Sequence, residues 1–115
     1  MLIKDMIKLV DCEVLCGSKK LDQRLEHAFG SDLMSDVLAY VEEETLLLTG
    51  LTNAQVIRTA EMLDLKAVLF VRGKKPSQDV IELAAENDIV LLTTNHTMYV
   101  TSGILYSHGL KGLSI

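Results

Sequence analysis

Three short polar segments of the chain hold residues that could do chemistry, at positions 49–53, 72–77 and 93–97. The middle segment supplies the positive charges of Arg72 and Lys74, and Gly73 lets a ligand approach the backbone closely. The outer segments add hydroxyl and amide groups at four positions, Thr49, Asn53, Thr94 and Asn95. This combination suits a phosphate or a carboxylate, so we predict that these residues bind an anionic small molecule. Thr, Asn and Gly also cap helices and form turns, so a purely structural role is the alternative.

The carboxylates and histidines give weaker indications. Asp32 and Asp36 stand one helical turn apart, and paired carboxylates can bind a divalent cation or act as acid and base. Further ligands cannot be placed around them, so we favour a capping or solvated role and predict no metal site. The histidines are single residues without a partner at helical spacing, and we expect His96 to form hydrogen bonds in its loop.

The sequence lacks the motifs of the common catalytic centres. It contains no G-x-S-x-G, H-E-x-x-H or Walker A pattern, and the run Gly73-Lys74-Lys75 lacks the long phosphate loop of a Walker A motif. We therefore predict that the chain is not an enzyme, and we assign neither a catalytic residue nor a cofactor. An enzyme or enzyme subunit that acts on a phosphorylated metabolite is the alternative.

A sequence repeat predicts the elements that position the three polar segments. Apolar runs begin at Leu46, Val68 and Val90, with a regular spacing of 22 residues. Each run is followed by a polar segment and then by a helical pattern, as in the strand, loop and crossover helix of a parallel sheet. Because the carboxyl ends of parallel strands share one edge, the polar segments should meet there. We predict a three-layer α/β domain with a mostly parallel sheet and crossover helices.

Apolar periodicity predicts the other elements. Residues 13–16 indicate a short strand, and residues 19–29 fit either a helix or a strand, of which we prefer the extended form. Helices are expected at residues 2–10, 32–42, 53–63, from about 77, and 97–108. The second of these should bury a stripe formed by Leu33, Met34, Val37, Leu38 and Val41. Expected caps are Ser31, a capping box from Thr52 to Gln55, and Gly109 in a left-handed conformation.

The composition indicates a single domain over residues 1–115. Apolar residues make up 49% of the chain and aromatic residues 4%, so the core should be aliphatic, and an apolar surface patch predicts a symmetric homodimer. The net charge of −5 argues against binding to nucleic acid or to an anionic membrane. Cys12 and Cys16 would lie about 13 Å apart on a strand, too far for a disulfide. Reduced thiols and the lack of a long apolar run predict a cytoplasmic protein.

Three stretches of the chain resemble the DRTGG domain family, in the family's order. Leu21-Asp22 and the run 30–39 are similar to a family segment with an S-D-L-L-S-D-V helix. The run 72–84 resembles T-G-G-x-x-P-S-x-x-V-x-x-L, and the run 91–97 resembles a stretch that ends in Asp-Thr. DRTGG domains occur beside CBS-domain pairs and in some phosphotransacetylases, and they resemble the N-terminal, non-catalytic domain of HPr kinase/phosphorylase. The resemblance implies a regulatory or ligand-sensing module, often dimeric, and not a kinase.

The chain departs from the family pattern at three places. The eponymous T-G-G falls on Glu26-His27-Ala28, the first Gly of the second T-G-G is Arg72, and the Asp of the third stretch is His96. Arg72 adds a positive charge and His96 removes a negative one, so both changes favour an anion. We expect a stand-alone regulatory module that binds a nucleotide or another phosphorylated small molecule. A purely structural interaction domain without a ligand is a further alternative.

Overall fold

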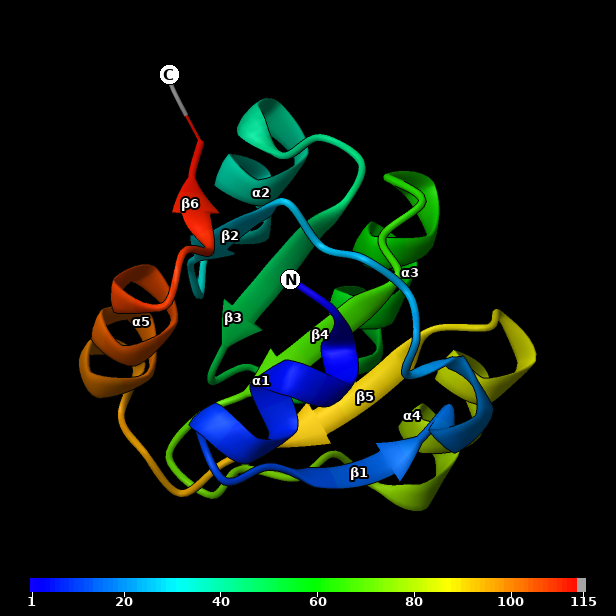
Figure 1. The fold of residues 1–115 in the computed structure, drawn as a ribbon. Coiled ribbons are helices and arrows are strands. Elements are labelled where there is room, and N and C mark those ends of the chain that lie inside the picture. Colours follow the sequence, from blue (N-terminus) through cyan, green and yellow to red (C-terminus); the bar gives the residue numbers. More distant parts are fainter. Residues whose placement is uncertain (114–115) are drawn as a thin grey trace.

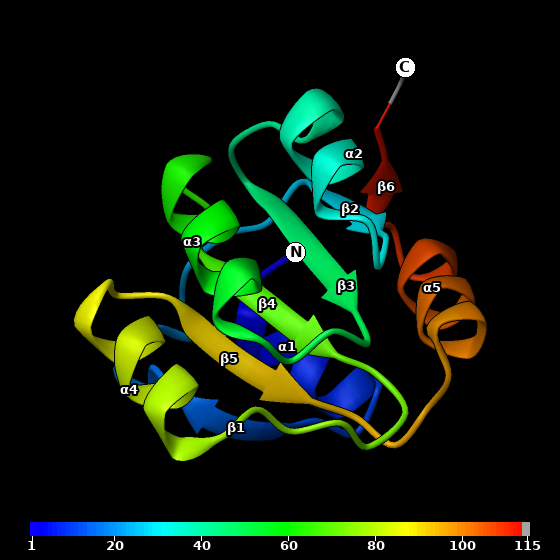
Figure 2. The same cartoon turned by 180° about the vertical axis from the view of Figure 1, so that it is seen from behind.

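The computed structural model describes residues 1–113, whose strands form one sheet between two layers of helices (Figures 1 and 2). The strands are β1 (Glu13–Cys16), β2 (His27–Gly30), β3 (Thr45–Thr49), β4 (Ala67–Phe70), β5 (Val90–Thr93) and β6 (Lys111–Gly112). The α-helices are α1 (Ile3–Leu9), α2 (Met34–Tyr40), α3 (Ala54–Met62), α4 (Gln78–Glu86) and α5 (Met98–Ser107), and η1 (Ser18–Lys20) is a short 3-10 helix.

The strands lie in the order β1-β5-β4-β3-β2-β6. β1 pairs antiparallel with β5, and the other neighbouring strands are parallel. Every residue of β3, β4 and β5 is buried, as expected for strands of a parallel sheet with helices on both faces. The predicted three-layer, mostly parallel α/β fold is therefore confirmed.

The direction of the chain decides which helices share a face. From β2 to β5 the chain crosses the sheet in one direction, and right-handed crossovers place α2, α3 and α4 together on one face. Between β5 and β6 the chain returns to the opposite edge, so α5 lies on the other face with α1 (Figure 1). One face of the sheet thus carries three helices and the other carries two.

Side chains alternate between two apolar layers along the central strands. Leu47, Val68 and Leu91 pack beneath α2, α3 and α4. Leu46, Leu48, Leu69 and Leu92 pack on the opposite face with residues of α1 and α5. This aliphatic core holds the carboxyl ends of β3, β4 and β5 at one edge, where the predicted site lies.

Helices α3, α4 and α5 end in the same type of C-terminal cap. Each helix is followed by a residue with positive φ, Asp64 (58°), Asp88 (59°) or Gly109 (101°). The N–H of the next residue then donates to a carbonyl five residues earlier, in the pairs Leu65–Ala60, Ile89–Ala84 and Leu110–Leu105. These are the bonds of a Schellman motif, which ends a helix and turns the chain toward the next strand. The left-handed cap predicted at Gly109 is confirmed.

The structure corrects several local predictions. Helix α2 is shorter than predicted, and Leu33 and Leu38 are 56% and 40% exposed instead of forming a buried stripe. Ser31 is not its N-cap; the hydroxyl of Ser31 accepts a hydrogen bond from the N–H of Leu33, which occupies that position. The capping box at residues 52–55 is also wrong, because Asn53 caps α3 without a side-chain hydrogen bond.

The ambiguous segment 19–29 combines turns with an extended end. It contains part of η1, then turns, and then most of β2, so the preference for an extended form was correct for its last residues. β6 was not predicted. None of the helices within residues 1–113 has the length and hydrophobicity that crossing a membrane requires.

Candidate functional site

Four consecutive loops contact one another at the carboxyl edge of the sheet. Asp32, after β2, accepts a hydrogen bond through Oδ1 from the N–H of Gly50, after β3, at 2.7 Å. The side chain of Arg72, after β4, lies against Gly50. The N–H of Arg72 in turn donates to the carbonyl of His96, after β5, at 2.8 Å. The loops that the sequence placed at one edge therefore form a connected cluster, with the β2–α2 loop as an additional member.

The backbone at Arg72 has an unusual conformation. Arg72 and Gly73 have φ values of 60° and 68°, and the N–H of Lys74 donates to the carbonyl of Val71 at 3.2 Å. Positive φ at both central residues is the pattern of a type I′ turn, which favours Gly, Asn or Asp. An arginine in the left-handed region costs about 1–2 kcal/mol relative to the right-handed one. Such strain tends to occur at functional sites, where the side chain is needed in a fixed place.

The absence of a side chain at Gly50 makes room for the guanidinium of Arg72. A Cβ atom at position 50 would collide with Nη2 of Arg72. Arg72 is exposed, and within residues 1–113 its guanidinium forms no ion pair with a carboxylate. Its donors are therefore available to an external anion, while one side of the group is supported by the backbone.

A second close approach joins the Gly73 turn to the β5–α5 loop. The N–H of Gly73 donates to the carbonyl of Thr94 at 2.8 Å, and a Cβ at position 73 would lie 2.9 Å from Oδ1 of Asn95. Asn95 is exposed, as are Lys74 and Asn53. The structure thus brings Arg72, Gly73 and Asn95 into one neighbourhood, whereas Asn53 stands at the N-terminus of α3.

The two threonines of the predicted site are already engaged. The hydroxyl of Thr49 donates to Oδ1 of Asp32 at 2.9 Å and accepts from the N–H of Leu51 at 3.2 Å. The hydroxyl of Thr94 donates to the carbonyl of Val10 at 2.6 Å. Both residues are buried, so their present role is to hold the loops, and ligand contact by either remains a prediction.

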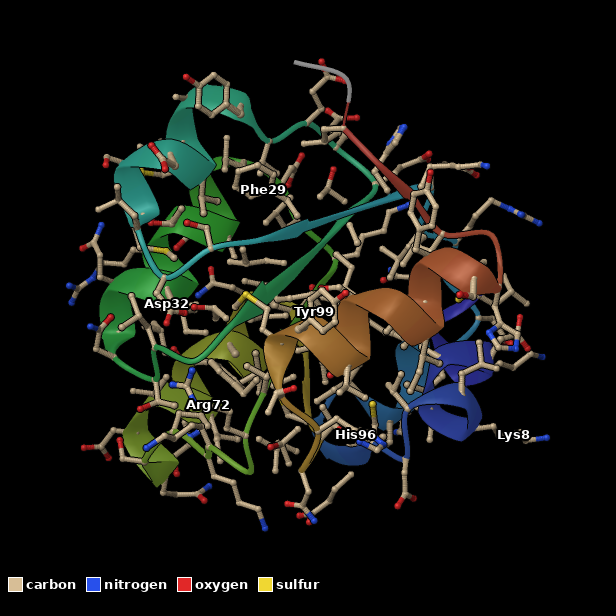
Figure 3. The ribbon with its side chains drawn as sticks, turned by 90° about the vertical axis from the view of Figure 1, so that its left-hand side faces the viewer. Lys8, Phe29, Asp32, Arg72, His96 and Tyr99 are labelled. Atoms are coloured by element: carbon tan, nitrogen blue, oxygen red, sulfur yellow. The ribbon has the colours of Figure 1, made fainter. Side chains whose placement is uncertain are left out.

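Asp32 is a member of the cluster, whereas the sequence analysis favoured a capping or solvated role for it. It was expected at the start of a helix, but it precedes α2, and its carboxylate holds the end of β3 through Thr49 and Gly50. Figure 3 shows Asp32 and Arg72 at the same end of the sheet. The available signal was its position after β2, which parallel pairing places beside the end of β3. The carboxylate of Asp32 therefore adds a negative charge to the carboxyl edge of the sheet, where we predicted an anion-binding site.

A polar hollow of about 260 Å³ lies beside the third loop, and Thr94 and Asn95 are among its lining residues. Glu13 and Lys75 contribute opposite charges to its wall and form an ion pair at 3.1 Å. Cys12 also lines the hollow, but burial, with a smaller contribution from Asp11, raises its pKa to about 12. The thiol is therefore protonated at neutral pH and is a poor nucleophile or metal ligand. Within residues 1–113, no group of three or more His, Cys, Asp and Glu side chains is arranged to hold a metal ion.

The fold and the loop cluster define a small α/β domain that presents polar loops at the carboxyl ends of its parallel strands. Its sequence matches the DRTGG domain over residues 5–107, and the chain belongs to this family. The resemblance drawn from the three sequence stretches is thus confirmed. Comparison with curated proteins gives no match.

A similar solved structure comes from the regulatory region of a pyrophosphatase. It is the crystal structure of the CBS and DRTGG domains of the Clostridium perfringens enzyme, complexed with the activator diadenosine tetraphosphate. The TM-score is 0.73 at 16% sequence identity, and the alignment covers 90% of this chain and 45% of that one. The chain therefore spans less than half of that regulatory region, with which it shares the fold.

Proposed function

We propose that this domain is a regulatory, ligand-sensing module that binds a phosphate-containing small molecule at the loop formed by Arg72, Gly73 and Lys74. The observation that carries the proposal is the guanidinium of Arg72, which is exposed, supported by Gly50 and held on a strained backbone. Within residues 1–113 the other non-glycine residues with positive φ are all acidic, so Arg72 is the cation held in this conformation.

The chemistry of the loop suits a phosphate. Arg72 can donate two parallel hydrogen bonds to phosphate oxygens, whereas Lys74 adds a point charge. The N–H of Gly73 is engaged by Thr94, and Oδ1 of Asn95 lies beside Gly73, so the amide nitrogen of the exposed Asn95 is the neutral donor of this loop. Asp32 opposes a highly charged anion, so we expect it to tune the affinity as well as hold Gly50.

The solved relative suggests which ligands to test first. That structure is a regulatory region in complex with a dinucleoside tetraphosphate activator. We would therefore test nucleotides first as ligands of this chain, followed by sugar phosphates and inorganic phosphate.

The test is calorimetric titration of this panel into four proteins: wild type, Arg72→Ala, Gly50→Ala and Arg58→Ala. Arg72→Ala should weaken binding by about 1.5–3 kcal/mol, the range for a hydrogen bond to a charged group. Gly50→Ala should also weaken binding, because it displaces the guanidinium without changing the charge. Arg58 is an exposed arginine of α3, so Arg58→Ala removes the same charge elsewhere and should bind as wild type does.

Two results would contradict the anion site. One is that no compound binds wild type below millimolar concentration. The other is that Arg58→Ala weakens binding as much as Arg72→Ala, because the effect would then reflect net charge and not a site.

We further propose that the module is non-catalytic, cytoplasmic and homodimeric. The raised pKa values of Cys12 and Cys16, both attributed chiefly to burial, agree with an absence of thiol chemistry. Both cysteines are free, as is usual in a reducing compartment. Hydrolysis of ATP above a mock preparation, abolished by Arg72→Ala, would contradict the non-catalytic assignment.

A further inference from the structure

Helix α5 differs from the other long helices in what it shows to solvent. Its ten residues, Met98–Ser107, include no charged side chain. Nevertheless Tyr99 is 89% exposed, Tyr106 64% and Val100 43%. Helices α3 and α4, in contrast, carry exposed charges at Arg58, Glu61, Asp79 and Glu86. A surface helix normally presents charged or strongly polar side chains to solvent, so exposed Tyr and Val on an uncharged helix indicate a face that another surface covers.

A hollow of about 600 Å³ lies between α5 and the edge of the sheet. Ala28, Gly30 and Leu48, from β2 and β3, are among its lining residues, and so are Tyr99, Gly103 and Tyr106 of α5. The hollow lies on the face of the sheet that carries α1 and α5, because Ala28, Leu48 and Leu105 of its lining belong to the apolar layer on that face. Within residues 1–113 this layer has two α-helices, whereas the opposite layer has three.

Gly103 leaves the middle of this wall open. It lies four residues after Tyr99 and three before Tyr106, so the three residues share one side of the helix. A Cβ atom at position 103 would meet nothing within 4 Å. The exposed side of α5 thus has two projecting aromatic rings with a notch between them, a shape that can receive another helix.

We propose that a second copy of this chain covers the hollow, through a two-fold contact between α5 helices in which Tyr99 of each copy enters the hollow of the other. The inference rests on the homodimer in the proposed function and names its surface. A two-fold contact uses one patch on both subunits, so that patch must be complementary to itself. A projecting ring and a hollow on the same face meet this requirement.

The charge distribution favours a second copy over other occupants. The hollow is lined by no carboxylate within the described chain, and its cation Lys111 already lies 5.8 Å from the ring centroid of Tyr106. The chain has a net charge of −5, so two copies repel least when the faces in contact carry no charge of their own. An acidic or basic partner would find little complementary charge here.

The wall of the hollow is mostly apolar, and two of its polar side chains, Ser107 and Lys111, already have partners within the chain. Binding pockets usually direct several polar groups at their ligand. In this hollow the hydroxyl of Ser107 is engaged, since it donates to the carbonyl of Gly103 at 2.7 Å. The hollow and the exposed side of α5 instead provide apolar surface and a complementary shape, and an interface between two copies requires both.

The experiment measures the mass in solution by sedimentation equilibrium for wild type, Gly103→Lys, Tyr99→Lys and Met62→Lys. Gly103→Lys is the decisive variant, because the site has room for a side chain and lysine favours a helix more than glycine does. The isolated subunit should therefore keep its fold. We expect wild type to be a dimer at micromolar concentration and Gly103→Lys to raise the dissociation constant at least about 100-fold, because a lysine would be buried unpaired.

Met62→Lys is the control for the effect of adding a lysine to an exposed helix position. Met62 is 72% exposed on α3, on the opposite face, so Met62→Lys should leave the dimer unchanged. A monomeric wild type at several hundred micromolar would overturn both the dimer and its surface. A dimer that Gly103→Lys and Tyr99→Lys leave intact would overturn this surface but not the dimer. Nucleotide titration of the monomeric variant tests the Arg72 loop independently of either result.

Discussion

The carboxylate of Asp32 accepts a hydrogen bond of 2.7 Å from the N–H of Gly50, and Gly50 in turn supports the guanidinium of Arg72. A negative group and a positive group thus act on one glycine from neighbouring loops. Asp32 thus has two opposite effects at this edge. Its hydrogen bonds stabilise the loops, and its negative charge weakens the binding of an anion there.

Asp32→Asn should therefore change stability and affinity in opposite directions. The variant loses charge-assisted bonds to Thr49 and Gly50, and we expect the free energy of unfolding to fall by about 1 kcal/mol. Removal of the negative charge should strengthen binding of a phosphorylated ligand. Urea unfolding and calorimetric titration measure the two effects. Asp36→Asn, on the exposed part of α2, is the control, and weaker ligand binding by Asp32→Asn would contradict the expectation.

The strain at Arg72 predicts a stabilising substitution. Glycine adopts the φ of 60° without a steric penalty, although it loses more backbone entropy on folding. Arg72→Gly should raise the free energy of unfolding by about 0.5–1 kcal/mol, while Arg72→Ala retains the strain and should not. Urea unfolding of the three proteins decides the point. Equal stability of the Gly and Ala variants would show that the turn is not strained.

Local sequence patterns were sufficient for the regular part of this fold. The 22-residue repeat located β3, β4 and β5, because fully buried parallel strands are continuous apolar runs and the crossover helices between them are of similar length. β6 has two residues, Lys111 and Gly112, and is formed by pairing with β2, so no local pattern indicates it. Leu33 and Leu38 have helical spacing, yet no layer covers them, and periodicity does not reveal which face has a neighbour.

The site was predictable only as a set of loops. Parallel pairing brings the ends of β3, β4 and β5 to one edge, so the placement of Arg72, Gly73 and Asn95 at that edge followed from the expected parallel strands. The contact between Arg72 and Gly50 depends on a left-handed backbone at a residue other than glycine, which sequence rules disfavour. The engagement of Thr94 with Val10, 84 residues away in the chain, is a tertiary effect that no local pattern shows.

Substitution of Gly17 should lower the free energy of unfolding more than substitution of most other glycines of the chain. Its φ is 87°, and a Cβ there would lie 2.9 Å from the Cα of Val90, a backbone atom that cannot easily move. Gly17→Ala combines this collision with backbone strain and should lower the free energy of unfolding by about 2–4 kcal/mol. Gly109→Ala is the matched control, because Gly109 also has positive φ (101°) but meets nothing within 4 Å. We expect it to cost about 1 kcal/mol, and equal losses would show that Val90 is not a barrier.

The Asp64 turn after α3 offers a further stabilising change. Asp64 has a φ of 58°, the conformation that Gly109 adopts at the corresponding position after α5. Asp64→Gly should raise the free energy of unfolding by about 0.5 kcal/mol, whereas Asp64→Ala should lower it. Thermal or urea unfolding measures both variants. If Asp64→Gly is destabilising, the aspartate contributes more to this turn than its backbone strain costs.

Cys12 should make stability depend on alkaline pH. Burial, and to a lesser degree Asp11, raises the pKa of its thiol from 9.0 to about 12 in the folded chain. The folded state therefore keeps the proton to higher pH than the unfolded state does. This contribution to stability is fully present below pH 9 and is lost as the pH rises toward 12.

The measurement is urea unfolding of wild type and Cys12→Ala at a series of pH values from about 8 to about 11. Wild type should lose stability more steeply above about pH 9, since other groups that titrate there are common to both proteins. Alkylation by iodoacetamide gives a second readout, because only the thiolate reacts at an appreciable rate. The rate at Cys12 in the folded protein should still rise above about pH 10, where that of the unfolded chain has levelled off. Parallel unfolding curves at every pH, with the same alkylation profile in both states, would show that the thiol is not buried from solvent in the folded protein.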